Sequence, residues 1–119
     1  MVQKIVSDFH ALYPGRSRWI MLKAVFNPSF VAVALIRSSQ IAKVIHIPIR
    51  WLLLILFGID VAYGVKIGGG LILPHPVGIV FGRGVVAGDQ LTVYQFVTLG
   101  SKNKAYPVIG AGVTIYPMS

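Results

Sequence analysis

The second half of the chain places an aliphatic residue at every sixth position. The residues between them are largely glycine, valine and polar types. The series consists of Val61, Ile67, Leu73, Ile79, Val85, Leu91 and Val97. An α-helix repeats at about 3.6 residues and a plain strand at about two, so neither produces this period. Six-residue repeats are typical of a parallel β-helix, in which three short strands form one coil and the coils stack.

A second apolar series supports the β-helix because it keeps a fixed offset of four from the first. Its members are Val65, Leu71 and Val77, and glycines recur near the expected corners. Glycine suits such corners because it adopts positive φ without steric cost. After Arg83 the register stays open, since a bulge there would shift it. The inward positions would then be Ala87, Val93 and Leu99.

The first part of the chain has the pattern of short helices. Asn27-Pro28 is a favourable helix start, because Asn is a good N-cap and Pro fits the first turn. The helices that we expect span 2–12, 17–26, 27–46 and 48–57, with breaks at Pro14-Gly15 and Ile47-Pro48. They would pack on the first coil or on a neighbouring subunit.

The chain therefore divides into a helical segment, 1–58, and a β-helix domain, 59–119. Residues 100–107 (GSKNKAYP) interrupt the period and predict a loop that projects from one corner. The repeat resumes at Val108 and stops within a hexad, so we expect the C-terminal coils to be truncated.

The charge is strongly basic, with 11 Lys and Arg against 3 Asp and a net charge of +8. Most of the basic residues lie before residue 58, among apolar side chains. This mixture predicts a peripheral membrane or partner contact through 1–58; nucleic acid is disfavoured because no reading motif is present. The apolar run Trp51–Phe57 is shorter than the about 20 residues that a bilayer needs. Without cysteine, we expect a cytoplasmic protein that can rest on the inner membrane surface.

His75 and Asp60 are the strongest candidates for chemistry. His75 lies between two prolines in LILPHPVG, and Asp60 precedes it by fifteen residues. On a coil of about 18 residues, that spacing places them near each other on adjacent rungs. A carboxylate beside a histidine fixes its tautomer and raises its basicity, as a general base requires. The other interpretation is a corner histidine and an aspartate that caps the junction of helix and coil.

The other polar groups give weaker signals. His10 and His46 are isolated in helical segments, and three scattered histidines predict no metal site. Lys102 and Lys104 lie on the projecting loop, where they are either solvated or placed to attract the phosphates of coenzyme A.

The run from Asp60 to Gly100 resembles the core of the serine acetyltransferases, a hexapeptide-repeat family. It is equally similar to the related O-acetyltransferases of exopolysaccharide clusters, such as the colanic acid type. The resemblance covers about 60 residues. It rests on the Asp60 to His75 spacing, on HPVGIV at 75–80 and on VYQFVTLG at 93–100.

This resemblance implies a mainly β fold, a left-handed parallel β-helix preceded by short helices, that assembles as a homotrimer. It also implies an acyltransferase that uses acetyl-CoA and no metal. His75 would deprotonate an acceptor hydroxyl while Asp60 orients it, and the hydroxyl would attack the thioester directly. The positions implied for the acceptor are Gln95 and Tyr106, and those implied for coenzyme A are Gly100, Lys102, Lys104 and Gly110.

Departures from the family pattern determine the acceptor that we expect. Serine acetyltransferases usually carry Asp before the catalytic histidine and an Arg-His pair before the loop proline. This chain has Pro74 at the first position and Ala105 and Tyr106 at the second. A site without those charges should not prefer free serine. We therefore expect a sugar hydroxyl of an exopolysaccharide or lipopolysaccharide precursor. The alternatives are a serine O-acetyltransferase of cysteine biosynthesis and a truncated β-helix scaffold with weak catalysis.

Overall fold

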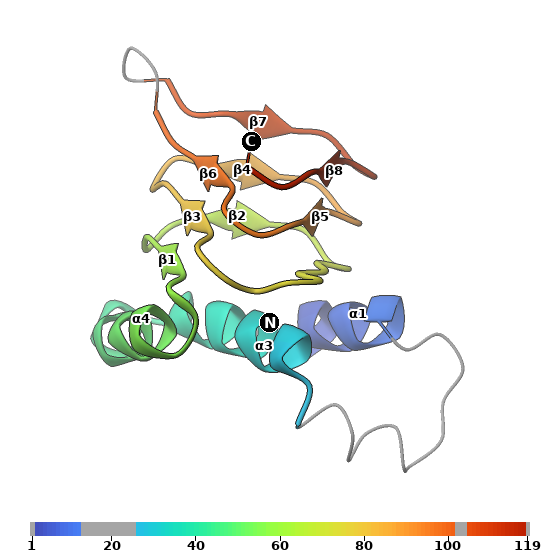
Figure 1. Ribbon diagram of the computed structural model, residues 1–119. Coiled ribbons are helices and arrows are strands. Elements are labelled where there is room, and N and C mark those ends of the chain that lie inside the picture. The colour runs from blue at the N-terminus through green and yellow to red at the C-terminus, as the bar shows by residue number, and fades with distance from the viewer. Residues whose placement is uncertain (1, 13–25, 102–104, 119) are drawn as a thin grey trace.

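The computed structural model describes residues 2–12, 26–101 and 105–118. Within these ranges three helices precede a stack of short strands (Figure 1). The helices are α1 (Val2–Leu12), α3 (Pro28–Ser39) and α4 (Lys43–Phe57). The strands are β1 (Asp60–Val61), β2 (Lys66–Ile67), β3 (Val80–Phe81), β4 (Val86–Ala87), β5 (Thr92–Val93), β6 (Thr98–Leu99), β7 (Val108–Ile109) and β8 (Thr114–Ile115). The helices form a layer beneath the strands.

The strands form three parallel sheets, one for each face of a β-helix. Their orders are β1-β3-β6, β2-β4-β7 and β5-β8, and Ile72 extends the third sheet through a bridge to Thr92. The whole six-residue series from Val61 to Val97 is buried. The predicted parallel stack of coils is therefore present.

After Arg83, both candidate series of inward residues point into the coil. Val85 and Ala87 flank the exposed Val86 and are both buried, and Leu91 and Val93 repeat the pattern one face later. Alternate residues of a strand face the same side, so each face contributes two neighbouring inward positions.

The coils differ in length, and the difference is located at one corner. Asp60 pairs with Val80, whereas Val80 pairs with Thr98, so the first coil is two residues longer than the second on this face. The extra residues lie between Leu73 and Ile79, both of which are buried. The chain therefore bulges outward at 74–78.

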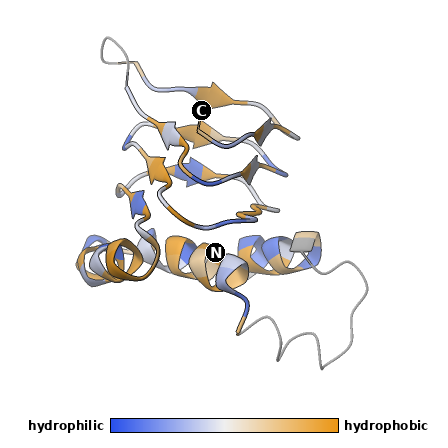
Figure 2. Cartoon of the chain, in the orientation of Figure 1, coloured by the Kyte–Doolittle hydropathy of each residue, from blue (hydrophilic) through white to orange (hydrophobic). Residues whose placement is uncertain are grey.

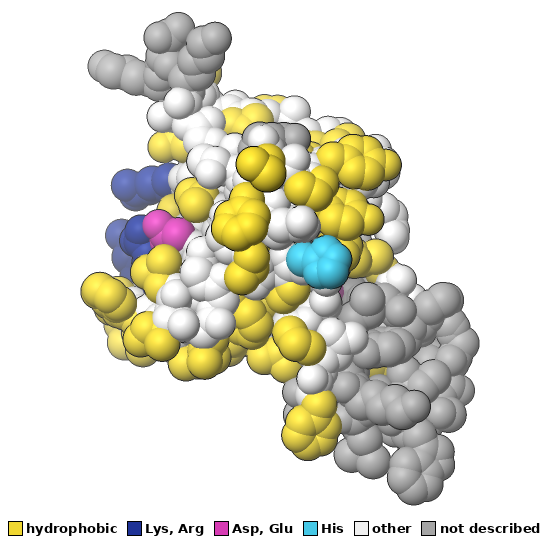
Figure 3. Space-filling view, in the orientation of Figure 1, with side chains coloured by type: hydrophobic (Ala, Val, Ile, Leu, Met, Phe, Trp, Pro, Cys, Tyr) yellow, Lys and Arg dark blue, Asp and Glu magenta, His cyan; other side chains and the backbone are white. Residues whose placement is uncertain are grey.

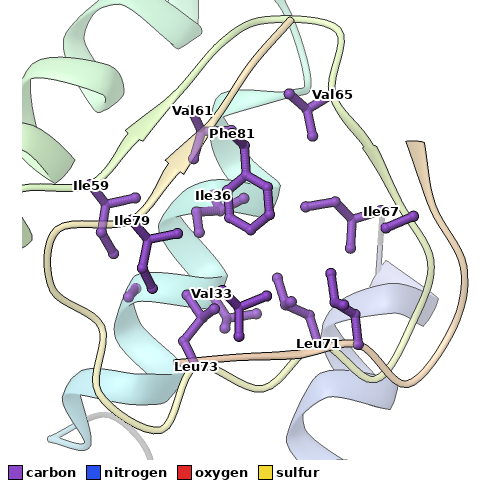
Figure 4. Close-up of a cluster of buried hydrophobic side chains, with 14 of the residues drawn as sticks. Val33, Ile36, Ile59, Val61, Val65, Ile67, Leu71, Leu73, Ile79 and Phe81 are labelled. Atoms are coloured by element: carbon purple, nitrogen blue, oxygen red, sulfur yellow. The ribbon is translucent and has the colours of Figure 1, made fainter. Parts of the chain in front are cut away.

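The helices close the lower end of the β-helix and share its core. Val33 and Ile36 of α3 and Leu53 of α4 belong to the same buried cluster as the coil residues. Figure 4 shows Val33 and Ile36 directed into the coil, towards Leu73 and Phe81. Each fully buried aliphatic side chain of this kind contributes about 1.5–3 kcal/mol. The first coil thus has its cap within the chain.

A buried ion pair fastens α1 and α3 to the first coil. The Arg37 guanidinium donates to Asp8 from Nε at 2.9 Å and from Nη2 at 3.0 Å. It also donates to the carbonyls of Ile67 and Gly68 at 2.6 and 2.5 Å. Asp8 Oδ1 accepts from the Leu71 amide at 2.7 Å. The two buried charges therefore satisfy each other and three backbone groups of the coil.

The predicted helix over 2–12 and the helix start at Asn27-Pro28 are confirmed. Asn27 Oδ1 accepts from the Ser29 amide at 2.9 Å, as an N-cap does. The predicted helix over 17–26 lies almost wholly outside the described residues.

The predicted helix boundary at Ile47-Pro48 is wrong. The break comes earlier, between Ser39 and Lys43, and α4 runs through Pro48. Gln40 lies at this break, and its side chain holds the break on the first coil by donating to the Ala62 carbonyl at 3.1 Å and accepting from the Gly64 amide at 2.9 Å. Pro48 lacks the N–H for one backbone hydrogen bond of the helix. The loss is tolerated because Pro48 lies on the exposed side, where water can reach the backbone.

Helix α4 is strongly apolar, as the hydropathy colours of Figure 2 show. One side of it packs on the coil and the other is exposed. In the part of the chain that the structure describes, no helix has the length and hydrophobicity needed to cross a bilayer.

Candidate active site

His75 projects from the corner where the first coil bulges outward. Its carbonyl accepts from the Val77 amide at 2.8 Å, which closes a tight turn. Gly78 adopts φ 65° and donates its amide to the Phe57 carbonyl at 3.2 Å. Ser29 Oγ donates to the Pro74 carbonyl at 3.3 Å. A backbone held on both sides therefore presents an exposed imidazole.

His75 begins a column of rings that continues on the next coils at the same corner. Its centroid lies 6.4 Å from that of Tyr94, and the Tyr94 ring stacks on Tyr116 at 5.7 Å with an interplanar angle of 13°. The imidazole therefore has an aromatic wall on one side.

Gln95 follows Tyr94 and carries a buried acceptor atom that lacks a donor. Its Oε1 has no hydrogen-bond partner among the described residues. A buried acceptor usually has a partner. A bound acceptor molecule with an N–H or O–H group would satisfy it.

Asp60 lies at the start of β1 and forms an ion pair with Arg50 of α4. Arg50 donates to the two carboxylate oxygens from Nε at 2.7 Å and from Nη2 at 3.0 Å. The hydrogen bond to Asp60 raises the pKa of Arg50, and partial burial opposes that rise. This pair holds the junction between the last helix and the first strand.

Within the described chain no hydrogen bond joins Asp60 to His75. The strand register explains why: Asp60 pairs with Val80, which lies five residues beyond His75 along the chain. The prediction assumed a coil of about 18 residues, and the outward bulge of the corner adds two residues to the first coil. The joint action of His75 and Asp60 stays a prediction.

Tyr106 lies against a glycine-rich edge of the second coil. A Cβ on Gly84 would clash with its side chain, and one on Gly82 would come within 2.7 Å of it. These two glycines therefore form the surface on which the ring lies.

The positions expected to bind coenzyme A lie on exposed corners of the upper coils. Gly100 follows β6 and Gly110 follows β7, and both are exposed. Nothing lies within 4 Å of a Cβ built on Gly110, so the space above it is open. Lys102 and Lys104 are outside the described residues. In the described ranges, no three His, Asp or Glu side chains gather where they could hold a metal ion.

Sequence reasoning missed Arg50 as the partner of Asp60 and Tyr116 as a member of the ring column. The signal for Tyr116 is present in the register, because Thr92 pairs with Thr114 and so places Tyr116 above Tyr94. The regular spacing between Tyr94 and Tyr116 is seen only when the extra residues of the projecting loop are subtracted.

No protein-family model matches the chain. Serine acetyltransferase of Staphylococcus epidermidis is 32% identical over 116 residues, which cover 94% of this chain and 48% of the relative. Serine acetyltransferase of Helicobacter pylori is 38% identical over 110 residues, which cover 89% and 55%. The chain thus spans about half the length of the curated relatives that it matches.

Solved structures agree with this similarity. Serine acetyltransferase of Neisseria gonorrhoeae in complex with serine matches with a TM-score of 0.83 and 24% identity, over 98% of this chain and 52% of the other. Isoform 3 from Entamoeba histolytica in complex with cysteine matches with a TM-score of 0.74 and 31% identity, over 95% and 44%. The predicted fold, a left-handed parallel β-helix behind short helices, is confirmed.

The comparisons contradict the predicted sugar acceptor, because the relatives are named serine acetyltransferases. They also give no support to the more specific likeness to colanic acid enzymes. The prediction relied on Pro74, Ala105 and Tyr106. Tyr106 packs on Gly82 and Gly84, so its presence has a structural reason and is no sign of a sugar site. In sequence and in its left-handed β-helix, the chain is similar to about half of a serine acetyltransferase, and its homologues are members of that family.

Proposed function

We propose that the chain is part of a serine O-acetyltransferase that takes its acetyl group from acetyl-CoA. The observation that carries this proposal is the 32% identity over 116 residues, 94% of the chain, with a curated serine acetyltransferase. The exposed His75 on a rigid corner, beside an aromatic wall, supports it with a residue able to act as a base.

In the proposed reaction, the imidazole of His75 accepts the proton of the serine hydroxyl. The serine oxygen attacks the thioester carbonyl, a carbon–oxygen bond forms and the carbon–sulfur bond breaks. The proton then passes from His75 to the leaving thiolate of coenzyme A. The 119 residues contain no cysteine, so no thiol of this chain is proposed to carry the acetyl group.

Asp60 is proposed to orient the imidazole of His75. For this, the Asp60 carboxylate must leave Arg50 and accept a hydrogen bond from His75 instead. The side chains of Arg50 and Asp60 are 44% and 31% exposed. Ion pairs with this much solvent contribute only about 0–1 kcal/mol, so the exchange costs little.

The remaining binding positions follow from the open corners of the coils. Gln95 Oε1, buried without a donor, would accept from the ammonium or hydroxyl of serine. Tyr106 would border the same acceptor. Acetyl-CoA would extend along the corners that carry Gly100 and Gly110, with Lys102 and Lys104 attracting its phosphates. The protein would act as a homotrimer, which light scattering would measure.

Release of thiol from acetyl-CoA, with serine as acceptor, tests the proposal. We expect turnover that yields O-acetylserine, identified by its mass. His75→Ala should lower kcat/KM by about 10²–10⁴-fold, the usual contribution of a general base.

The matched control is His10→Ala, which removes a histidine from α1 and should leave kcat/KM within about twofold of the wild type. Circular dichroism on each variant establishes that it is folded. A folded protein without serine turnover would refute the activity, and full activity in His75→Ala would refute the role of His75.

A further inference from the structure

The outer face of α4 is an exposed apolar stripe. Val44, Ile47, Trp51 and Ile55 follow one another at steps of three or four residues, so they lie along one side of the helix. Their exposed fractions are 83%, 61%, 63% and 76%. We call these four residues the outer face. Isolated apolar residues on a surface are ordinary, but a continuous stripe of this kind marks a contact surface.

A basic hollow lies directly beside the outer face. Lys43, Ile47 and Arg50 of α4 line it together with Tyr63 of the first coil and Arg83 of the second. Ile47 therefore belongs to both the hollow and the outer face. In Figure 3, the dark-blue Lys and Arg side chains lie on the α4 side of the molecule, above hydrophobic side chains at the lower edge of that side.

The carboxylate beside this hollow is already neutralised, because Asp60 is bound to Arg50. Together with the net charge of +8, this leaves a surface suited to an anionic partner. Arg83 and Tyr63 supply donors for phosphate oxygens.

We propose that the outer face of α4 lies in the headgroup region of an anionic lipid bilayer, with a lipid phosphate in the basic hollow. A helix with an apolar stripe, a tryptophan and basic residues along its polar flank has the form of an interfacial helix. The stripe is a convex helix surface, and a fluid lipid surface can surround such a shape.

Charge argues against a symmetric pair of chains that meet through this face. Two copies arranged outer face to outer face would bring two basic hollows together, each on a chain of net charge +8. Like charges in one interface oppose association. An anionic membrane gives the opposite sign of interaction.

Sedimentation with lipid vesicles is the first test. We expect the full chain to bind vesicles of phosphatidylcholine mixed with phosphatidylglycerol, and to bind pure phosphatidylcholine far more weakly. Ile55→Glu should lower the partition coefficient about tenfold or more, since it removes apolar area and adds a negative charge.

Val108→Glu is the matched control. Val108 is 78% exposed and lies on β7, at the end of the molecule opposite the helices (Figure 1). Val108→Glu changes the charge by the same amount as Ile55→Glu. If the loss of binding is specific to the outer face, Val108→Glu should bind the vesicles within about threefold of the wild type.

Fluorescence of Trp51 locates the contact. The chain has two tryptophans, and Trp19→Phe leaves Trp51 as the sole reporter. Its emission should move to shorter wavelength when phosphatidylglycerol vesicles are added, and brominated lipids should quench it. Lys43→Ala and Arg83→Ala should each weaken binding severalfold, as should added salt.

Several results would overturn the proposal. Unchanged Trp51 emission with vesicles, or equal loss of binding in Ile55→Glu and Val108→Glu, would place the contact elsewhere. A blue shift that depends on protein concentration without lipid, with a larger mass in light scattering, would identify a second copy on the face. A last outcome combines two results: millimolar inorganic phosphate at constant ionic strength abolishes vesicle binding, and vesicles leave the Trp51 emission unchanged. The hollow would then be a site for soluble phosphate only.

Discussion

Two Arg–Asp ion pairs join the helices to the first coil, and they differ in burial. The Arg37 and Asp8 side chains are 6% and 1% exposed, and both have further backbone partners. The Arg50 and Asp60 side chains are 44% and 31% exposed. Both pairs use two parallel hydrogen bonds, so the chemistry of the contact is the same.

Burial decides which of these charges are structural and which are available to other partners. Water cannot replace a partner of Arg37 or Asp8, so the loss of either leaves a buried, unpaired charge. Water can replace a partner of Arg50 or Asp60 at low cost. The buried pair therefore holds the helical layer on the coil, and the exposed pair lies where Asp60 can serve the proposed reaction and Arg50 the proposed lipid contact.

Asp8→Ala should have the largest effect on stability. It leaves the Arg37 guanidinium buried without its counter-charge and the Leu71 amide without its acceptor. We expect the free energy of unfolding to fall by about 3–5 kcal/mol, measured by urea denaturation. The control is Asp89→Ala, which removes an exposed acceptor of the Gly69 amide and should cost about 1 kcal/mol or less.

The double variant Asp8→Leu with Arg37→Met sharpens this prediction. An apolar pair of similar volume leaves no buried charge, so it should recover much of the stability lost in Asp8→Ala. If the single variant were as stable as the wild type, Arg37 would not be the fastening that we describe.

Replacing each arginine by lysine should separate the two pairs by a smaller amount. Arg37 donates four hydrogen bonds to Asp8, Ile67 and Gly68, and an ammonium group cannot reproduce that fork. Arg37→Lys should therefore cost about 1–3 kcal/mol, whereas Arg50→Lys should cost less than about 1 kcal/mol. Equal costs in urea denaturation would contradict the distinction.

Arg50→Ala should have the smallest effect on stability, about 0–1 kcal/mol, and this effect should shrink as salt is added. Serine turnover should persist in Arg50→Ala, because the proposed role of Asp60 needs its release from Arg50.

Asp60→Asn should be as stable as Arg50→Ala, and it should lower kcat/KM about tenfold or more. If Asp60→Asn leaves kcat/KM unchanged, Asp60 is only the partner of Arg50.

The local features of the chain could be predicted from sequence. The six-residue period predicted the inward residues from Val61 to Val97, and all of that series is buried. Asn27 was predicted as a helix cap, and its side chain accepts from the Ser29 amide. Such features depend on a few neighbouring residues, so a repeat or a cap is visible in the order of the amino acids.

The β-helix and its buried series therefore follow from the order of the amino acids. The partners of Asp60, Tyr106 and Gln40, and the break between α3 and α4, are visible only in the folded chain, because contacts between coils depend on the exact length of each coil. The two extra residues beside His75 and the loop at 100–107 change that length, so distances counted along the chain no longer predict which side chains meet in space.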